Sequence, residues 1–204
     1  QVQGLATTIG TFSTKCVVNA AGPEAGVIAR YAGLEIPFVS RRHELLIVRP
    51  KRPVSGALPW LIDTDRQVHL RPDGGGRALI GGFMKRDEST DPEFYAREYS
   101  TEWAKNVRIE VSKAFGLTKP DCEIIEGWAG LYPGTHDYLP ILEMSLPGLI
   151  TAAGFSGTGL MHAPAIGRIV TDMVSGHTPD GIDVSSLGSG RFARLGPIAE
   201  TSGF

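Results

Sequence analysis

Cysteine is scarce in this chain, and its spacing excludes the cysteine-based classes of protein. Cys16 and Cys122 are the only two cysteines in 204 residues. They form no metal-binding spacing, and two are too few for the disulfide framework of a small secreted domain. We therefore expect two reduced thiols in a cytoplasmic protein, and no bound metal.

Long hydrophobic runs and an excess of charge of one sign are absent as well. No apolar run approaches the ~20 residues that cross a bilayer, so no membrane span is predicted. Lys and Arg number 20 against 22 Asp and Glu, which gives a net charge of −2 and no reason to expect nucleic acid as a partner. At 42% hydrophobic and 21% charged residues, the composition is that of an ordinary folded protein with one good core or two modest ones.

An initiating methionine and a signal peptide are also lacking. The chain opens on Gln1, and its first 22 residues already have the pattern of strands. We therefore expect the chain to be a piece of a longer protein.

Periodicity and glycine punctuation predict a mixed α and β chain. Residues 15–20 form a buried-strand pattern, Gly22 breaks it, and Pro23 is placed as a first helical residue before a short helix that ends at Gly33. A block of strands follows, with a hairpin turn between its last two members. The predicted strands of this block are 41–50, 67–72 and 77–83, with the turn at 73–76.

One strong helix pattern interrupts the strands. It runs from Asp91, a natural N-cap followed by Pro92, to Gly116, a natural stop. Large apolar side chains recur every four residues along it, which indicates a helix packed on a sheet rather than a cofactor site. These side chains are Tyr95, Tyr99, Trp103, Val107, Val111 and Phe115.

The stretch "AAGFSGTGLMHAPAIGR", residues 152–168, brings three glycines directly before an apolar-periodic segment. The periodicity predicts a helix that begins near Leu160 or Met161. Bare backbone at a helix N-terminus suits a flat or anionic ligand, but a tight turn between a strand and a helix explains the spacing too. The Lys-Ser/Thr pair of an NTPase phosphate loop and the G-x-S-x-G of a hydrolase are both missing.

Four segments in order carry a resemblance to a known superfamily: "VVNAAGPEAG", "LRPDGGGRALIGG", "GWAGLYPGTHDYLPIL" and the glycine stretch. They resemble the FAD-dependent amine and amino-acid oxidoreductases of the D-amino-acid oxidase superfamily. The most similar branch contains sarcosine oxidase, dimethylglycine dehydrogenase and the β subunits of proline and sarcosine dehydrogenases.

The resemblance implies an α+β fold in two parts. Residues 1–35 and 126–185 would form part of an FAD/NAD(P)-binding α/β domain. Residues 36–125 would form a mostly antiparallel substrate domain covered by a helix, and residues 186–204 a C-terminal tail.

The cofactor implied by the resemblance is FAD, held without a covalent bond. Covalently flavinylated relatives carry a cysteine where this chain has Gly130, and Cys122 comes several residues too early. The helix N-terminus would favour the negative charge of reduced flavin. The implied cofactor-binding residues are Ala21, Gly22, Gly130, Gly154, Phe155, Ser156, Gly157, Thr158, Gly159, Leu160 and Met161.

The family's N-terminal G-x-G-x-x-G turn, which grips the pyrophosphate, is absent here. We therefore expect this chain to be the C-terminal half of the enzyme, completed by a missing N-terminal half or a partner subunit. The fragment alone is not expected to hold FAD tightly.

The departures from the family narrow the range of possible substrates, which the resemblance limits to small-molecule amines. Tyr132 stands where the amino-acid oxidase branch has an arginine that clamps the substrate carboxylate, so the N-methyl or cyclic-amine branch fits better. A carboxylate anchor is expected instead from Arg42, from Arg71 or from the missing half. Asp137 is expected to fix its loop rather than to act as a base. The candidate substrate-lining residues are His69, Arg71, Phe83 and Tyr132.

The predicted function is FAD-dependent oxidation of a secondary or tertiary amino acid of the sarcosine, dimethylglycine or proline type. Met161 replaces a lysine that aids oxygen reduction in monomeric sarcosine oxidase, which favours a dehydrogenase over an oxidase. The alternatives are a related flavoprotein that acts on glycerol 3-phosphate or a modified nucleoside, and a non-catalytic scaffold that lacks a complete FAD site.

Overall fold

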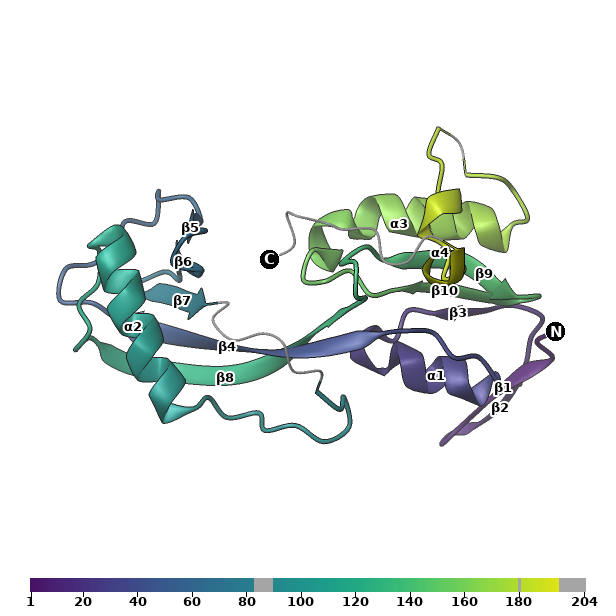
Figure 1. Ribbon diagram of the computed structural model, residues 1–204, viewed down its shortest axis with the longest axis horizontal. Helices are drawn as coiled ribbons and strands as arrows, with labels where there is room; N and C mark the ends of the chain where they lie inside the picture. Colours follow the sequence, from purple (N-terminus) through teal and green to yellow (C-terminus); the bar gives the residue numbers. More distant parts are fainter. Residues whose placement is uncertain (83–89, 180, 195–204) are drawn as a thin grey trace. The chain divides into compact units, whose positions relative to one another are not determined.

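The computed structural model describes residues 1–82, 90–179 and 181–194, which fold into two compact units (Figure 1). Unit 1 comprises Gln1–Ser40 and Tyr132–Phe204, and unit 2 comprises Arg41–Leu131. The expected mixture of sheets and helices is confirmed. The units divide after residues 40 and 131, whereas the sequence placed the domain divisions after residues 35 and 125.

Unit 1 is built on a small sheet in the order β3–β10–β9, flanked in sequence by an N-terminal hairpin. Its elements are β1 (Gly4–Thr7), β2 (Gly10–Ser13), β3 (Val17–Asn19), the 3₁₀ helix η1 (Gly22–Glu24), α1 (Ala25–Tyr31), β9 (Ile141–Leu146), β10 (Leu149–Ala153), α3 (Gly159–Val174), the 3₁₀ helix η2 (Ser185–Leu187) and α4 (Arg191–Arg194).

The strands β3 and β10 of this sheet run parallel, with Val18 opposite Ile150, and β9 pairs antiparallel on the other side of β10. Each parallel strand leads into a helix, and α1 and α3 lie on opposite faces of the sheet (Figure 1). Ile169 of α3 packs on Leu142 and Ala152. The strand–turn–helix units predicted at both ends of the chain are thus confirmed, and their turns follow the carboxyl ends of neighbouring strands.

Unit 2 is a five-stranded sheet in the order β5–β6–β7–β4–β8 with one helix. The pairs β5–β6, β6–β7 and β7–β4 are antiparallel, and the predicted hairpin joins β6 to β7. Its elements are β4 (Val39–Arg49), β5 (Leu61–Asp63), β6 (Val68–Pro72), β7 (Ala78–Gly82), α2 (Thr101–Phe115) and β8 (Glu123–Gly134).

The helix α2 begins nine residues later than the sequence pattern predicts, with its N-cap at Ser100 instead of Asp91. Asp91 does not cap it, because its carboxylate accepts a hydrogen bond from the N–H of Glu93 (2.9 Å) in a local turn. The cap is Ser100, whose Oγ accepts from the N–H of Trp103 at 3.2 Å. The predicted end is correct, since Gly116 adopts the left-handed conformation with φ 64°.

The predicted apolar face of this helix does pack on the sheet. Val107 and Val111 are fully buried and meet Leu46 and Ile80 in one core, where each valine stabilises the fold by about 1.5–3 kcal/mol. Tyr99 precedes the helix but reaches the same core. The four-residue recurrence of large apolar side chains therefore extends N-terminal of the true helix start, because Tyr99 lies outside the helix but packs on the same core.

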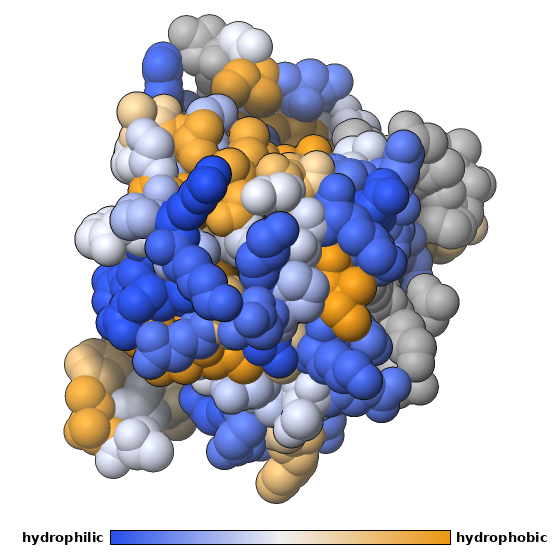
Figure 2. Space-filling model, turned by 90° about the vertical axis from the view of Figure 1, so that its left-hand side faces the viewer, coloured by the Kyte–Doolittle hydropathy of each residue, from blue (hydrophilic) through white to orange (hydrophobic). Residues whose placement is uncertain are grey.

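Figure 2 shows the surface on the side where α2 lies in Figure 1. Hydrophilic side chains predominate on this surface, with several apolar patches between them. No helix within residues 1–82, 90–179 and 181–194 is long and apolar enough to cross a membrane.

Both cysteines are free, and Cys122 lies in the core under α2, where burial raises the pKa of its thiol despite the opposing charge of Arg108.

The two candidate caps of α2 give opposite predictions on substitution. Ser100→Ala removes a helix-capping hydrogen bond and should lower the free energy of unfolding by about 1 kcal/mol. Asp91→Ala is the matched control and should change it by less than about 0.5 kcal/mol, because Asp91 is an exposed loop residue. Urea unfolding followed by circular dichroism measures both, and an equal loss in the two variants would contradict the assigned helix start.

Candidate functional site

A buried asparagine shapes the turn that follows β3. The Nδ2 of Asn19 donates to the carbonyl oxygen of Ala25 (2.9 Å), and its Oδ1 accepts from the N–H of Ala21 (3.4 Å). Gly22 has φ +56°, and a Cβ there would meet open space. The left-handed backbone, not crowding, therefore requires this glycine. Asn19 was missed in the sequence, although an amide directly after two valines of a predicted strand was a usable signal.

The glycine loop that follows β10 is held by aromatic rings. A Cβ on Gly154 would lie 3.0 Å from the ring of Phe38, and one on Gly157 would lie 2.5 Å from the ring of Tyr132. Both glycines also have positive φ, +80° and +89°. The loop is tied down by the N–H of Ser156, which donates to the carbonyl oxygen of Pro133 at 2.8 Å. Gly154 and Gly157 thus have a packing reason of their own, in line with the tight-turn interpretation.

Unlike the glycine loop, the N-terminus of α3 has no packing contact that explains its sequence. Thr158 occupies the N-cap position, but its Oγ1 donates to the carbonyl oxygen of Phe155 (2.7 Å) and does not cap the helix. The first turn holds no acidic residue, and Leu160 and Met161 are 91% and 68% exposed. Such an end presents backbone N–H groups and partial positive charge to a ligand.

A groove of about 370 Å³ connects the two turns within unit 1. Gly22 and Gly154 both line it, at the carboxyl ends of β3 and β10, and no lining residue is charged. In open α/β sheets this end of the strands is where ligands bind. The lining residues are Val18, Ala20, Gly22, Pro133, Ala152, Ala153, Gly154, Phe155, Gly159, Ala163, Ile166, Gly167 and Val170.

Tyr132, predicted to line the substrate, lies in unit 1 with its ring against Gly157. The structure therefore brings this residue directly to the loop that was predicted to bind the cofactor. Gly130 precedes it on β8, and a Cβ on Gly130 would meet open space.

His69 and Arg71 lie together in unit 2, on the face of β6 that points away from the core under α2. His69 is 5% exposed, with its ring over Gly81 and edge-on to Trp60 at 5.4 Å between centroids. Arg71 is exposed, and its guanidinium donates to the carbonyl oxygen of Pro72 (3.2 Å). The fourth substrate candidate, Phe83, lies outside the described residues.

Arg42 is not available as the carboxylate anchor. Its Nε donates to the carbonyl oxygen of Ala96 (2.8 Å), and its other nitrogens bind the carboxylate of Glu44 and the carbonyl oxygen of Glu98. These contacts tie the segment before α2 to β4. Of the two arginines that the sequence suggested, Arg71 is therefore the candidate that the structure leaves.

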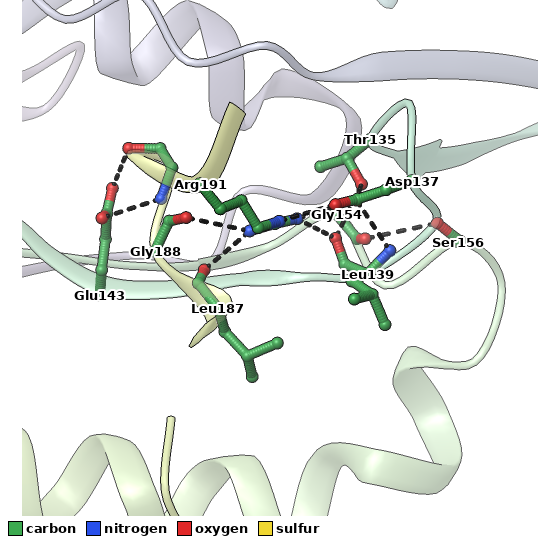
Figure 3. A network of polar contacts seen from close by, with 10 residues as sticks. Thr135, Asp137, Leu139, Glu143, Gly154, Ser156, Leu187, Gly188 and Arg191 are labelled. Atoms are coloured by element: carbon green, nitrogen blue, oxygen red, sulfur yellow. Dashed lines mark hydrogen bonds and ion pairs between the residues drawn. The ribbon is translucent and has the colours of Figure 1, made fainter. Parts of the chain in front are cut away.

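Asp137 fixes its loop, as predicted, through a buried network (Figure 3). Its carboxylate accepts from Arg191 (2.7 and 2.9 Å), from the Oγ1 of Thr135 (2.6 Å) and from the N–H of Leu139 (3.2 Å). Burial alone would raise the pKa of Asp137, but the hydrogen bonds from Arg191 and Thr135 outweigh it and lower the pKa to about 2. Because this pKa lies far below neutral pH, Asp137 stays ionised and acts as a structural anion rather than a proton acceptor.

The same network explains a residue that the sequence did not single out. Arg191 is 4% exposed and also donates to the carbonyl oxygens of Leu139 and Leu187. It thereby joins the segment after α3 to the turn that follows β8. In the described part of the chain, no group of three or more His, Cys, Asp or Glu side chains could hold a metal ion.

Comparison with known proteins places this geometry in a family. The family DAO, described as FAD dependent oxidoreductase, matches residues 1–173. The glycine oxidase of Geobacillus kaustophilus is 30% identical over 83% of this chain, and human mitochondrial sarcosine dehydrogenase is 26% identical over 82%. The crystal structure of L-proline dehydrogenase from P. horikoshii superposes with a TM-score of 0.83 at 28% identity, over 96% of this chain.

The chain spans only part of each of these proteins. It covers 43% of the glycine oxidase, 19% of the sarcosine dehydrogenase and 52% of the proline dehydrogenase chain. About half of the glycine oxidase and of the proline dehydrogenase, and about four fifths of the sarcosine dehydrogenase, therefore lie outside the matched region.

The Arg191–Asp137 pair should contribute to stability in a pH-dependent way. Arg191→Met leaves a buried carboxylate without its partner and should lower the free energy of unfolding by about 3–5 kcal/mol at pH 7. Because the pKa of Asp137 is lowered from 3.8 to about 2, the pair's contribution is complete above about pH 4 and is lost as the pH falls towards 2. Urea unfolding at a series of pH values measures both effects.

The matched control is Arg66→Met, which removes an exposed arginine whose ion pairs are 3.7 Å long. It should cost less than about 1 kcal/mol. An equal loss in the two variants, or a loss from Arg191→Met that stays constant from pH 7 to pH 3, would contradict the assigned role of the pair.

Proposed function

The chain belongs to the DAO family of FAD-dependent oxidoreductases, and we propose that it is the C-terminal half of an enzyme that oxidises a secondary or tertiary amino acid. The observation that carries the proposal is the meeting of two glycine turns and an uncapped helix N-terminus around one groove. The residues present fit a flavin, because the groove wall is apolar and the backbone donors stand at its end.

In this proposal the cofactor is non-covalent FAD, which when bound accepts a hydride at N5 from the α-carbon of the amine. The residues that would hold it are Ala21, Gly22, Gly130 and the loop 154–161. Gly22 leaves room for close backbone approach, and the first-turn N–H groups of α3 would stabilise negative charge on the ring. The groups that grip the pyrophosphate and ribose would come from the missing N-terminal half or from a partner subunit, and no nucleic acid is expected as a partner.

The substrate class follows from the candidate lining residues. Tyr132 places a neutral ring beside the glycine loop instead of a charged clamp. In unit 2, the exposed Arg71 is the proposed carboxylate ligand. His69, set between Gly81 and Trp60, would line the amine. A sarcosine, dimethylglycine or proline type of substrate fits this set, in agreement with the names of two of the similar proteins.

Met161 supports a dehydrogenase rather than an oxidase. Its thioether is exposed at the helix end that would face the ring, and it supplies no positive charge to stabilise reduced oxygen. The electrons would then pass to a carrier other than oxygen. The enzyme itself is expected in the cytoplasm.

The visible spectrum of the protein, extended upstream to its natural start, tests the function. We expect a yellow protein whose flavin band bleaches on anaerobic addition of sarcosine, dimethylglycine or proline. A yellow protein that none of the three bleaches removes the substrate class, and glycerol 3-phosphate and a modified nucleoside are then the compounds to add. A natural-length protein that stays colourless with added FAD leaves a non-catalytic scaffold and refutes the enzyme.

A second experiment tests the role of Met161 in the same protein. Met161→Lys places a cation at the proposed flavin face and should raise the rate at which oxygen reoxidises the reduced flavin by about tenfold or more. Met161→Leu is the neutral control and should leave that rate unchanged. Stopped-flow reoxidation measures it, and equal rates in the two variants would show that this position does not govern oxygen reactivity.

A further inference from the structure

The glycine loop is braced by one neighbouring segment, residues 132–135. The N–H of Ser156 donates to the carbonyl oxygen of Pro133 at 2.8 Å. A Cβ on Gly154 would lie 3.5 Å from Cγ2 of Thr135, so the loop packs against this side chain as well. The loop and the bracing segment both belong to unit 1. The position of the loop therefore depends on where the bracing segment lies.

The loop needs such a brace because its backbone is strained. Gly154 and Gly157 have positive φ, and so does Ser156, at +51°. The left-handed region is unfavourable for a residue with a side chain, and such a conformation persists only where the surrounding structure enforces it. The side chain of Ser156 contributes little to this, since its Oγ reaches the carbonyl oxygen of Gly154 only at 3.5 Å. The enforcing contacts therefore come from outside the loop.

The bracing segment is fixed in turn by the buried network around Asp137 (Figure 3). Thr135 is fully buried, and its Oγ1 lies 2.6 Å from the carboxylate of Asp137 and 2.7 Å from the carbonyl oxygen of Leu139. Arg191 donates to the same two groups, at 2.7 and 2.9 Å for the carboxylate and 2.8 Å for the carbonyl oxygen. A further left-handed residue, Tyr138 with φ +62°, lies in this turn. The network thus holds a strained turn directly beside the strained loop.

We propose that Thr135, Asp137 and Arg191 are positioning residues that hold the glycine loop in its left-handed conformation and thereby set the affinity of the groove for the flavin. None of the three lines the groove, so each acts through the bracing segment. Arg191 lies beyond residue 173, where the match to the family ends, so the site is controlled from outside the matched region. This inference rests on the proposed function for the identity of the ligand.

Thr135→Val tests the network with little change of shape. It keeps the methyl group beside Gly154 and removes the hydroxyl. In the natural-length protein without FAD, we expect the amide of Ser156 to exchange with deuterium at least about tenfold faster relative to the amide of Ile150. Ile150 is fully buried in the central strand β10 and reports on opening of the whole sheet. A purely structural loss would speed both amides equally and leave their ratio unchanged.

Thr151→Val is the matched control for this variant. Thr151 is also fully buried in unit 1, and its Oγ1 accepts from the Oγ of Ser145 at 2.8 Å, but it takes no part in the contacts of Asp137. This variant should leave the ratio of the two exchange rates within about twofold of the wild-type value.

Arg191→Lys is the second test variant, and it keeps the positive charge. One ammonium group cannot replace the guanidinium fork that binds both oxygens of Asp137 and the carbonyl oxygen of Leu139. The ratio of the exchange rates should therefore rise as it does in Thr135→Val. An unchanged ratio in both variants would overturn the positioning role.

The affinity for FAD connects the loop with the site. Calorimetric titration of the natural-length protein should give a Kd for FAD about tenfold higher in Thr135→Val and Arg191→Lys, and the same Kd as the wild type in Thr151→Val. A raised exchange ratio with an unchanged Kd would show that the network does not control the site, and the proposal would be wrong. A wild-type protein that binds no FAD refutes the proposed function, and the exchange ratio alone then decides whether the network holds the loop.

Discussion

The parallel pairing of β3 with β10 is the constraint on which the candidate site depends. These strands lie about 130 residues apart in the chain, and their pairing with Val18 opposite Ile150 places both following turns at one edge of the sheet. Neither turn would form a site alone, because a single glycine turn offers too few donors to hold a large ligand. The register of three residue pairs thus converts two local features into one groove.

Local features were predictable from the sequence because their causes are local. The turn at Gly22, the hairpin between β6 and β7 and the start of α3 depend on residues within a few positions of each other. The helix α2 shows where this ends, because Asp91 and Ser100 are both good caps and the apolar recurrence spans both. The helix begins after Ser100 because the Oγ of Ser100 accepts from the N–H of Trp103, whereas the carboxylate of Asp91 accepts from the N–H of Glu93 in a local turn.

Features set by contacts over long distances in sequence were not predictable. Arg191 and Asp137 are 54 positions apart, and nothing near either residue indicates the other. In the sequence, nothing near Arg42 indicates a partner for its charge. In the structure, its guanidinium donates to the carbonyl oxygen of Ala96, which is 54 positions away. The aromatic rings over Gly154 and Gly157 belong to the same class, since Phe38 and Tyr132 come from other segments.

The buried link between Arg191 and Asp137 sets a lower limit on the size of a fragment that can be produced in the laboratory. A protein cut after α3 would look complete by its helices and strands, but it would leave an ionised carboxyl sealed in the interior. Such a fragment would have to open its core to water to hydrate that charge. The short segment after α3 is therefore a part of the folding unit and not a dispensable extension.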